Sequence, residues 1–361
     1  MIPPFLKTHN RQLAYTILLK EYSKRSRICQ EKVIQMKKGS ENRIQRKDRD
    51  LFDQARNVTR ENHGSNVTFY LPGMIRYGKM RGLYPALSLT GDRCQLLCEH
   101  CKGLLLKPMI KAEDPETLIT KCLKLAHSGH LGVLLSGGSD LEGRLPWKKF
   151  CNAIHKIKTE TDLFLSIHSG FLDFDTAVAL KEAGVDQALI DGMGDEETAK
   201  RIYHLDSLQE VITSLENLFQ SGLDVVPHIV AGLMNGKIHG EYRALHIIRR
   251  FNPSSLVIVV LTPLKGTPMS DVLPPPPIEV ARLIATARIM MPHIPISLGC
   301  ERPRNRQGQL MEELAIYAGA TRMAVWSKKT IDLALNLGLK PRFQPTCCSV
   351  PYRQNFSENF L

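Results

Sequence analysis

The sequence lacks an apolar run long enough to cross a bilayer, and its first residues do not form a secretory signal peptide. Aromatic residues make up only 6% of the chain, and they are not interleaved with basic residues as a nucleic-acid surface requires. The nine cysteines are clustered instead of evenly paired, which does not suit a disulfide framework. We therefore expect a cytoplasmic protein with reduced thiols and no membrane partner, and we do not expect nucleic acid as a partner.

What the chain does contain is enough apolar material for a large core. It has 361 residues, of which 43% are hydrophobic, so it can form one barrel-sized domain with an extension. The net charge of +12 is uneven, because residues 1–63 hold 15 Lys and Arg against 7 Asp and Glu. Such a basic end can face an acidic protein, an anionic membrane or nucleic acid, or it can be a solvated helical surface.

Three cysteines follow a short apolar stretch in the pattern Cys94-x3-Cys98-x2-Cys101. The stretch 86–90 has the composition of a strand, so all three thiols are expected on the loop that leaves it. Three thiolates can hold three irons of a cubane cluster and leave the fourth iron open to an added molecule. Structural zinc would need a fourth protein ligand, for which only His100 is near, and three buried thiols without function are the remaining alternative.

From residue 86 onward, strand-like runs alternate with amphipathic helical patterns. Eight such units predict an α/β fold, a parallel (β/α)8 TIM-type barrel, because parallel strands need crossover helices. A (β/α)6 partial barrel with a C-terminal extension is the alternative. The strand-like runs are 86–90, 132–136, 163–168, 187–190, 225–230, 256–261, 296–298 and 323–325. The helical segments are 115–127, 147–158, 175–183, 207–220, 241–250, 278–290, 309–318 and 330–337.

Other elements come before the first unit. Helical spacing over 13–38 and 50–62 predicts two cover helices, and the β-branched and aromatic stretch 67–71 predicts a strand. We therefore expect three parts along the chain. These are a basic helical N-terminal extension over 1–66, a barrel over 67–338 and a C-terminal tail over 339–361.

In a parallel barrel, reactive residues lie on the loops at the carboxyl ends of the strands. The second strand ends in Gly137 and Gly138, which either let the backbone approach a ligand or form a tight turn. The fourth ends in Asp191, whose carboxylate can accept from two hydroxyls or cap a turn. The fifth carries His228 and then Gly232, and a lone His on an apolar strand is also common as a satisfied core residue.

A second group of cysteines lies near the end of the chain. Cys300 follows the seventh strand, and Cys347 and Cys348 lie in the tail. If the tail folds back over the barrel mouth, these thiols and Ser349 can converge and hold an auxiliary iron-sulfur cluster. The alternative is free cysteines that pack as small apolar residues. The basic turn 302–304 could hold a substrate carboxylate or tune the cluster, or it could be solvated.

In order and spacing, these motifs resemble the radical S-adenosylmethionine (SAM) superfamily and, within it, the biotin synthase-like branch. The segments GVLLSGGSD, HIVAGL with a following Gly-Glu, KGTPM, LGCERPR and the terminal Cys-Cys most resemble the two-protein lipoyl synthase of archaea and some bacteria. The sequence departs from the single-chain lipoyl synthase by lacking its N-terminal cysteine motif. It departs from biotin synthase by lacking the barrel-strand cysteines of that enzyme's auxiliary cluster.

The resemblance implies that Cys94, Cys98 and Cys101 hold a 4Fe-4S cluster that binds SAM and yields a 5′-deoxyadenosyl radical. His100 would lie near the adenine, and no catalytic side chain is implied beyond the cluster ligands. The implied cofactor-binding residues are His100, Gly137, Gly138, Asp191, His228 and Gly232. The implied ligands of a second 4Fe-4S cluster, the sulfur donor, are Cys300, Cys347 and Cys348.

The reaction expected from the resemblance is sulfur insertion into an octanoyl chain on a carrier protein, by a lipoyl synthase subunit. The implied partners are an octanoylated lipoyl-carrier protein or domain, a sister radical SAM subunit, and an electron donor such as ferredoxin or flavodoxin. A biotin synthase-like isomerase or cofactor-maturation enzyme without sulfur insertion is the first alternative. A nucleic-acid-modifying member of the superfamily and a zinc-stabilised binding module are the others.

Overall fold

The structure is a computed structural model that describes residues 45–353, and its contacts divide the chain into two units, the larger spanning Leu51–Tyr352. The helix expected over 13–38, Cys29 and most of the basic extension lie outside the described residues. The helices are α2 (Arg46–His63), α3 (Pro115–His127), α4 (Trp147–Glu160), α5 (Phe174–Glu182), α6 (Glu196–Ile202), α7 (Leu208–Gln220), α8 (Glu241–Ile248), α9 (Pro277–Met290), α10 (Arg306–Tyr317) and α11 (Lys328–Asn336). The strands are β1 (Asn66–Tyr70), β2 (Arg76–Tyr77), β3 (Met80–Arg81), β4 (Ala86–Ser88), β5 (Ile110–Lys111), β6 (Gly132–Ser136), β7 (Phe164–His168), β8 (Gln187–Asp191), β9 (Val225–Ala231), β10 (Leu256–Val260), β11 (Ile296–Leu298), β12 (Arg322–Ala324) and β13 (Lys340–Gln344).

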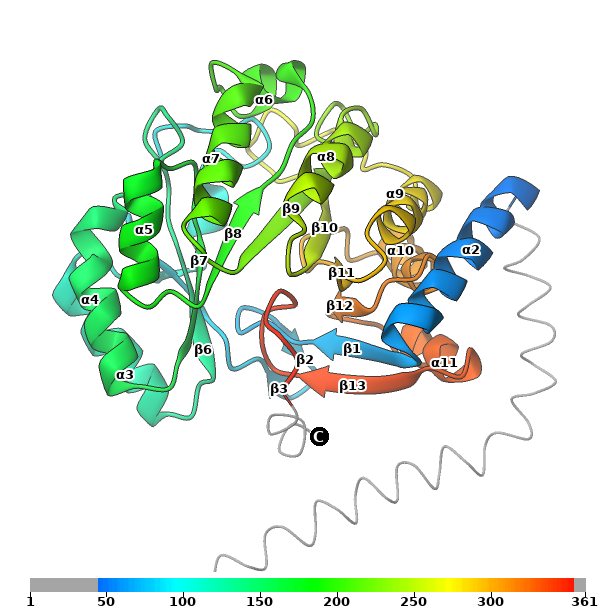
Figure 1. Ribbon diagram of the computed structural model, residues 1–361, viewed down its shortest axis with the longest axis horizontal. Helices are drawn as coiled ribbons and strands as arrows, with labels where there is room; N and C mark the ends of the chain where they lie inside the picture. Colours follow the sequence, from blue (N-terminus) through cyan, green and yellow to red (C-terminus); the bar gives the residue numbers. More distant parts are fainter. Residues whose placement is uncertain (1–44, 354–361) are drawn as a thin grey trace, which may run out of the picture. The chain divides into compact units, whose positions relative to one another are not determined.

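Eleven strands form one parallel sheet in the order β13-β1-β12-β11-β10-β9-β8-β7-β6-β4-β5. The eight predicted strand–helix units are confirmed, because β4 and β6 to β12 lie side by side in chain order. The sheet curls but does not close into the predicted ring (Figure 1). The reason is that β1, which precedes the first unit, pairs with β12 where β4 would have closed a barrel. The result is a half-barrel with β5 and β13 at its edges.

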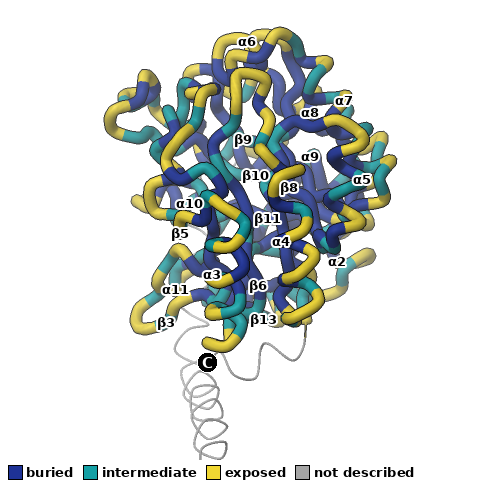
Figure 2. Tube along the Cα trace, turned by 90° about the vertical axis from the view of Figure 1, so that its left-hand side faces the viewer, coloured by how far each residue is buried: buried dark blue, intermediate teal, exposed yellow. Residues whose placement is uncertain are grey.

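The two faces of the curled sheet have different neighbours. Along β8, Ala188 and Ile190 join the large core formed with the outer helices, whereas Leu189 belongs to a smaller interior core with Tyr70. This alternation follows from the two-residue period of a strand. Figure 2 shows the strands buried beneath helices whose outer sides are exposed. The interior of the half-barrel is therefore lined by every second strand residue.

Several helices begin at an acidic cap that the sequence places directly after a strand loop. Asp114, Asp173 and Asp195 each accept a hydrogen bond from a backbone N–H at the start of α3, α5 and α6, at 2.8, 2.7 and 2.7 Å. A side-chain cap of this kind stabilises a helix by about 1 kcal/mol. Each cap marks the residue at which a strand-end loop ends and a helix begins. These loops surround the carboxyl ends of the strands, a region here called the mouth.

The last described residues continue this unit, because β13 pairs with β1 along its whole length. The tail loop, residues 345–350, then enters the interior of the half-barrel (Figure 1). Its carbonyls accept hydrogen bonds from Gln187 and Arg322, the first residues of β8 and β12. The same loop also packs with Tyr70, the last residue of β1, and with Cys300, which follows β11. The tail therefore lies inside the half-barrel and reaches Cys300, and its folding over the mouth stays a prediction.

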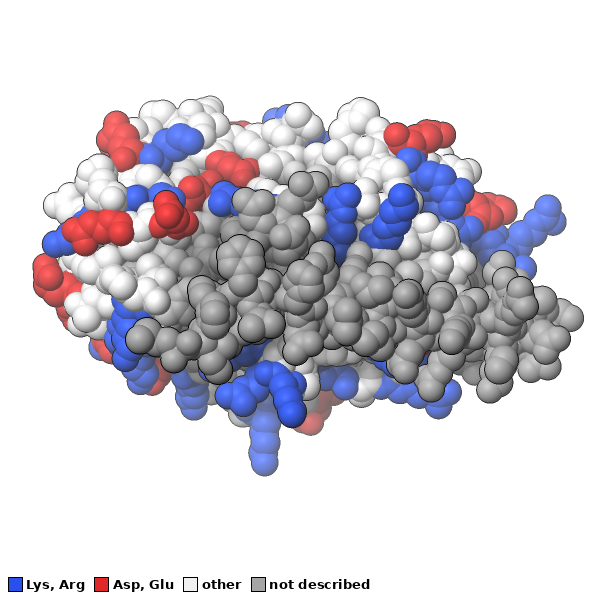
Figure 3. All heavy atoms as spheres, turned by 90° about the horizontal axis from the view of Figure 1, so that it is seen from below, with Lys and Arg blue, Asp and Glu red and all other residues white. Residues whose placement is uncertain are grey.

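Within residues 45–353, no helix combines the length and apolarity that crossing a bilayer requires. Charged side chains of the described residues are shown from below in Figure 3, where Lys and Arg spread along the lower edge of the view. The basic excess expected for residues 1–63 falls mainly outside the described part of the chain.

Candidate functional site

The cysteine loop, residues 89–103, is tied to the neighbouring strand end by one threonine. Thr90 Oγ1 donates a hydrogen bond to the carbonyl of Arg93 at 2.9 Å and accepts one from the N–H of Gly138 at 2.7 Å. Gly138 lies in the loop that follows β6. The hydroxyl of Thr90 therefore holds the cysteine loop and the Gly137–Gly138 turn together at the mouth.

The first thiol set, Cys94, Cys98 and Cys101, is brought together by this loop. A hydrogen bond from the Cys98 thiol, together with His100, lowers the pKa of Cys101 although burial acts in the opposite direction. The same hydrogen bond and burial raise the pKa of Cys98, and Cys94 acts on it at longer range. The loop thus favours a thiolate at Cys101, and the thiolate is the form that binds metal.

Gly138, here called the glycine cradle, packs closely against the first residue of this thiol set, Cys94. A Cβ on Gly138 would come within 2.5 Å of the Cβ of Cys94 and within 2.0 Å of the carbonyl oxygen of Arg93. Only glycine allows so close an approach of two backbones. His100 Nδ1 is buried, and no group of the described residues hydrogen-bonds it, so it is available to a ligand. The donor set, the cradle and this imidazole fit a SAM-binding 4Fe-4S cluster.

Asp191 lies at the end of β8 and is linked to the cysteine loop. Its Oδ2 accepts a hydrogen bond from the Tyr203 hydroxyl at 3.1 Å, and its Oδ1 lies 3.6 Å from His168 Nε2. The ring of Tyr203 lies 5.3 Å from the ring of His100. Because a carboxylate has about four acceptor positions, Asp191 can still accept hydroxyls of a ligand. The sequence missed Tyr203, which follows the short helix α6 that was not expected.

His228 lies on the interior face of β9 and is 9% exposed. Its Nδ1 lies 3.1 Å from the carbonyl of Val226, and its ring centre lies 5.8 Å from that of His168. Burial, followed by the neighbouring His168, lowers the pKa of His228 to about 4. His228 is thus a neutral imidazole inside the half-barrel, and its contact with a ligand stays a prediction.

Gly232 occupies a turn after β9 with a positive φ of 90°. Its N–H donates to Glu241 Oε1 at 2.7 Å, and a Cβ there would come within 2.5 Å of Pro275. The described contacts of Gly232 therefore explain the glycine by local packing. A role in cofactor binding stays a prediction.

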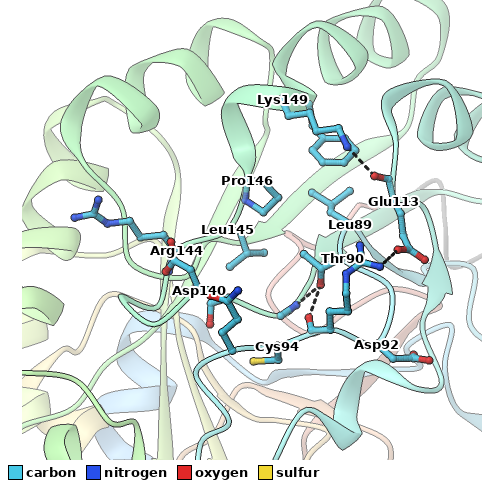
Figure 4. Close-up of a pocket in the computed structure, with 15 residues that line it drawn as sticks. Leu89, Thr90, Asp92, Cys94, Glu113, Asp140, Arg144, Leu145, Pro146 and Lys149 are labelled. Carbon is cyan, nitrogen blue, oxygen red and sulfur yellow. Dashed lines mark hydrogen bonds and ion pairs between the residues drawn. The ribbon is translucent and has the colours of Figure 1, made fainter.

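A cavity of about 650 Å³ opens beside Cys94 (Figure 4). Its walls come from the cysteine loop, the loop after β6 and the first residues of α4. Arg93 pairs with Glu113 at 2.7 Å, and Lys149 Nζ donates to the Glu113 carbonyl at 3.0 Å. The cavity therefore has charges of both signs and gives access to Cys94.

The second thiol set, Cys300, Cys347 and Cys348, also converges, together with Ser349. A hydrogen bond from the Cys348 thiol lowers the pKa of Cys347 against the effect of burial, and the Ser349 hydroxyl, 3.5 Å from Cys347 Sγ, acts with it. Burial, followed by the Cys347 charge, raises the pKa of Cys300 to about 12. The set therefore contains one favoured thiolate, and only Cys348 of its three cysteines is fully buried. Its binding of a cluster stays a prediction.

Three side chains from three strands hold the backbone of this set. Arg322 Nη1 donates to the carbonyls of Cys348 and Ser349 at 3.3 and 3.1 Å. Ser297 Oγ donates to Cys348 O at 3.3 Å, and Gln187 Nε2 donates to Ser349 O at 3.3 Å. Polar residues at inward positions of apolar strands were the signal that the sequence offered for these contacts.

Tyr70, the last residue of β1, lies beside the second thiol set. It belongs to one interior core with Cys348, against which Cys300 also packs, and it is fully buried. Burial raises the pKa of Tyr70 to about 12, with the Cys348 and Cys347 thiols acting in the same direction and Arg322 in the opposite one. Sequence reasoning missed Tyr70, because the place of β1 in the sheet was unknown.

The two arginines of the turn after Cys300 have different surroundings. Arg302 is buried and pairs with Glu312 at 2.8 Å, and it also donates to the carbonyls of Gly299 and Ala324. Arg302 therefore does not lie in solvent, and a role of the turn in tuning a cluster or holding a carboxylate stays a prediction. Arg304 is exposed and donates to the Cys300 carbonyl.

No three His, Cys, Asp or Glu side chains of residues 45–353 are grouped so that they could hold a single metal ion. In each thiol set, two thiols are in contact and the third acts at longer range. Structural zinc, whose protein ligands converge on one ion, stays an alternative to a cluster.

Comparison with known proteins identifies relatives of this chain. Residues 245–351 match the Biotin and Thiamin Synthesis associated domain. The chain is 25% identical to biotin synthase of Acetivibrio thermocellus over 225 residues, which is 60% of this chain and 68% of that protein. It is 26% identical to biotin synthase of Neorickettsia sennetsu over 286 residues, which is 75% of this chain and 80% of that protein.

Solved structures with the same fold include methylornithine synthase, with a TM-score of 0.57 and 17% identity over 82% of this chain and 90% of that one. The FeFe-hydrogenase maturase HydG of Carboxydothermus hydrogenoformans has a TM-score of 0.60 and 16% identity, over 97% of this chain and 87% of that one. At these identities the likeness shows the shared fold alone.

Proposed function

Because the chain is a radical SAM protein of the biotin synthase-like branch, we propose that it is a lipoyl synthase subunit that inserts sulfur into an octanoyl chain on a carrier protein. The observation that carries this proposal is the second thiol set inside the half-barrel, where Cys300 meets Cys347 and Cys348. A sulfur-inserting enzyme needs a sulfur source, and three converging thiols could hold one there. The octanoyl substrate is supported by the motif resemblance.

The first thiol set would hold a 4Fe-4S cluster, which when bound supplies the electron that cleaves SAM to a 5′-deoxyadenosyl radical. The chain's own residues then position the cofactor. Gly138 lets the backbone approach Cys94, and the Asp191 carboxylate, oriented by Tyr203, accepts ribose hydroxyls. The neutral His228 ring lines the interior without adding charge.

The second thiol set would hold the sulfur source, and its surroundings suit an acyl substrate. Leu189, Val226 and Val257 form the interior core beside Cys348. Apolar side chains of this kind favour a hydrocarbon chain over a polar substrate. The three strand side chains that bind the tail carbonyls keep the thiols fixed against that apolar wall.

A second candidate is an isomerase or cofactor-maturation enzyme without sulfur insertion. The observation that favours it is the fold likeness to methylornithine synthase and HydG, each of which covers more than four fifths of this chain. In that case the second thiols would be packing residues, and a cluster at the first set would suffice.

The proposed partners remain those implied by the resemblance. An octanoylated lipoyl-carrier protein would bring the substrate, and a sister radical SAM subunit would share the two insertions. An electron donor such as ferredoxin or flavodoxin would approach through the cavity beside Cys94, because this cavity gives access to the first thiol set.

The test is anaerobic turnover of reconstituted protein with SAM, a reductant and an octanoylated carrier or lysine peptide, followed by mass spectrometry. Iron and sulfide are measured on the same samples. We expect about eight irons per chain, from two clusters, and substrate that gains the mass of sulfur. The variant Cys300→Ala should keep SAM cleavage and lose the sulfur-containing product.

Two outcomes would contradict the proposal. About four irons per chain, with SAM cleavage but no added sulfur, would favour the isomerase or maturation enzyme. Stoichiometric zinc without visible charge-transfer absorption would favour the binding module.

A further inference from the structure

Tyr70 carries a hydroxyl that the protein leaves unsatisfied. The residue is 0% exposed, and no group of the described residues meets hydrogen-bond geometry with its hydroxyl. Leaving a buried hydroxyl without a partner costs about 1 to 3 kcal/mol. The Thr68 side chain acts on the phenol and lowers its pKa, but it does not meet hydrogen-bond geometry, so the hydroxyl can still donate to another partner.

A second buried tyrosine in the same interior provides the contrast. Tyr84 is 2% exposed and packs in one cluster with Cys347. Its hydroxyl lies 2.5 Å from Ser166 Oγ and also accepts from the Ser166 N–H at 3.2 Å. The interior of the half-barrel therefore satisfies one phenol and leaves the other without a hydrogen bond, so an unpaired phenol is not a general feature of this interior.

The neighbours of Tyr70 limit which groups can form a hydrogen bond with its hydroxyl. Its ring packs with Cys348, and Cys300 lies against the same core. The Arg322 guanidinium lies 5.9 Å from the ring centre and donates to tail carbonyls, so it offers no acceptor. Gln187 Oε1 is also buried without a described partner, but it is an acceptor and cannot donate to sulfur. Tyr70 is thus a donor beside the second thiol set.

We propose that the Tyr70 hydroxyl donates a hydrogen bond to a sulfur atom of the iron-sulfur group held by Cys300, Cys347 and Cys348. The inference rests on the proposed function, because it requires a sulfur-containing group at the second thiol set. A hydrogen bond to a cluster sulfur stabilises negative charge there and raises the reduction potential. Tyr70 is therefore a positioning residue that tunes the sulfur source.

The experiment compares Tyr70→Phe with Tyr84→Phe, two matched losses of a buried hydroxyl. Both are made in full-length protein that also carries Cys94→Ala, Cys98→Ala and Cys101→Ala, so that any cluster reports the second thiol set alone. Thermal unfolding is measured on the metal-free proteins. Redox titration, monitored by visible absorption and electron paramagnetic resonance, is measured after anaerobic reconstitution.

We expect opposite patterns from the two variants. Without metal, Tyr70→Phe should keep or raise the midpoint of unfolding, because it removes an unsatisfied hydroxyl, whereas Tyr84→Phe should lower it. With the cluster bound, Tyr70→Phe should move the reduction potential to a more negative value, and Tyr84→Phe should leave it unchanged. A merely structural role of Tyr70 would not produce this pattern.

The failures of the two proposals are distinguishable. A second cluster that binds normally and has the same potential in Tyr70→Phe overturns the inference about Tyr70 alone. If no cluster binds to the second thiol set in the parent protein, both the sulfur source and the hydrogen bond to it are overturned.

Discussion

Arg302 and Glu312 form a buried ion pair behind the second thiol set, with Arg302 Nη2 2.8 Å from Glu312 Oε1. The guanidinium also donates to Gly299 O at 2.6 Å, directly before Cys300, and the carboxylate accepts from the Ser327 N–H at 2.7 Å. The pair thereby joins the loop after β11 to the start of α11. Its position shows that the basic turn after Cys300 serves to fix that cysteine in place.

We therefore expect Arg302→Met to destabilise the protein by about 3 to 5 kcal/mol, because it leaves Glu312 buried without its partner. Urea unfolding of the metal-free protein measures this change. The double variant Arg302→Met with Glu312→Gln should recover part of the loss. The matched control is Arg304→Met, which removes an exposed guanidinium and should change stability by less than about 0.5 kcal/mol. Equal losses in the two single variants would contradict this account.

A second prediction concerns the glycine cradle. Gly138→Ala should remove the cluster of the first thiol set, because its Cβ would lie 2.0 Å from the Arg93 carbonyl and 2.5 Å from the Cys94 Cβ. About half of the bound iron and nearly all SAM cleavage should be lost, as measured by iron analysis and by chromatography of 5′-deoxyadenosine. Gly137→Ala is the control for iron binding, which it should leave unchanged, since its nearest contact is the Thr90 side chain at 3.1 Å. Full iron binding by Gly138→Ala would show that the loop can shift.

The order of the eight strand–helix units could be predicted because each unit has a local signal, such as the apolar run of β6 followed by the amphipathic pattern of α4. Even helix bounds followed, as for α3, which spans the expected Pro115–His127. The short helix α6 was missed because seven residues give less than two full turns of periodicity. Because α6 was not predicted, Tyr203, which contacts Asp191, was not predicted as a site residue either.

The open sheet and the place of the tail could not be predicted in the same way. Strand β1 carried a clear local signal, but nothing in its five residues specifies β12 and β13 as its neighbours. Pairing between distant strands depends on which edges remain free after the other units have packed. For this reason the sequence indicated that Cys300, Cys347 and Cys348 could meet, but it did not indicate that the tail would pack against Tyr70 of β1.

A third prediction concerns pH. His228 has a folded-state pKa of about 4 against an ordinary value of 6.5, so the unfolded chain binds its proton more readily. The neutral His228 ring therefore makes its full contribution to the free energy of unfolding above pH 6.5, and this contribution is lost as the pH falls toward 4. His63, whose pKa burial and Arg288 also lower to about 4, acts in the same direction. The free energy of unfolding of the metal-free protein should fall between pH 7 and pH 5.

His228→Gln should reduce the slope of the free energy of unfolding against pH by up to about 1.4 kcal/mol per pH unit below pH 6.5, because one titrating group is removed. Denaturant unfolding at pH 7 and pH 5 measures the slope. The control is His155→Gln, on the exposed side of α4, which should leave the slope unchanged. An unaltered slope in His228→Gln would mean that the imidazole is accessible to water in the folded protein.

The last prediction tests the proposed role of Asp191. Asp191→Asn should weaken SAM binding by about 10-fold to 100-fold, because a hydrogen bond to a charged acceptor contributes about 1.5 to 3 kcal/mol. Calorimetric titration of the reconstituted protein with SAM under anaerobic conditions measures the affinity. Both clusters should remain bound, since neither thiol set includes this residue.

Tyr203→Phe separates binding by the carboxylate from its orientation. It keeps the charge of Asp191 and removes only the hydroxyl that lies 3.1 Å from Oδ2, so we expect a loss of affinity of about 3-fold. SAM affinity equal to that of the parent protein in Asp191→Asn would show that the ribose lies elsewhere. Equal losses in the two variants would instead show that Asp191 depends on Tyr203 to reach the ligand, because the other described group near the carboxylate is the more distant His168 at 3.6 Å.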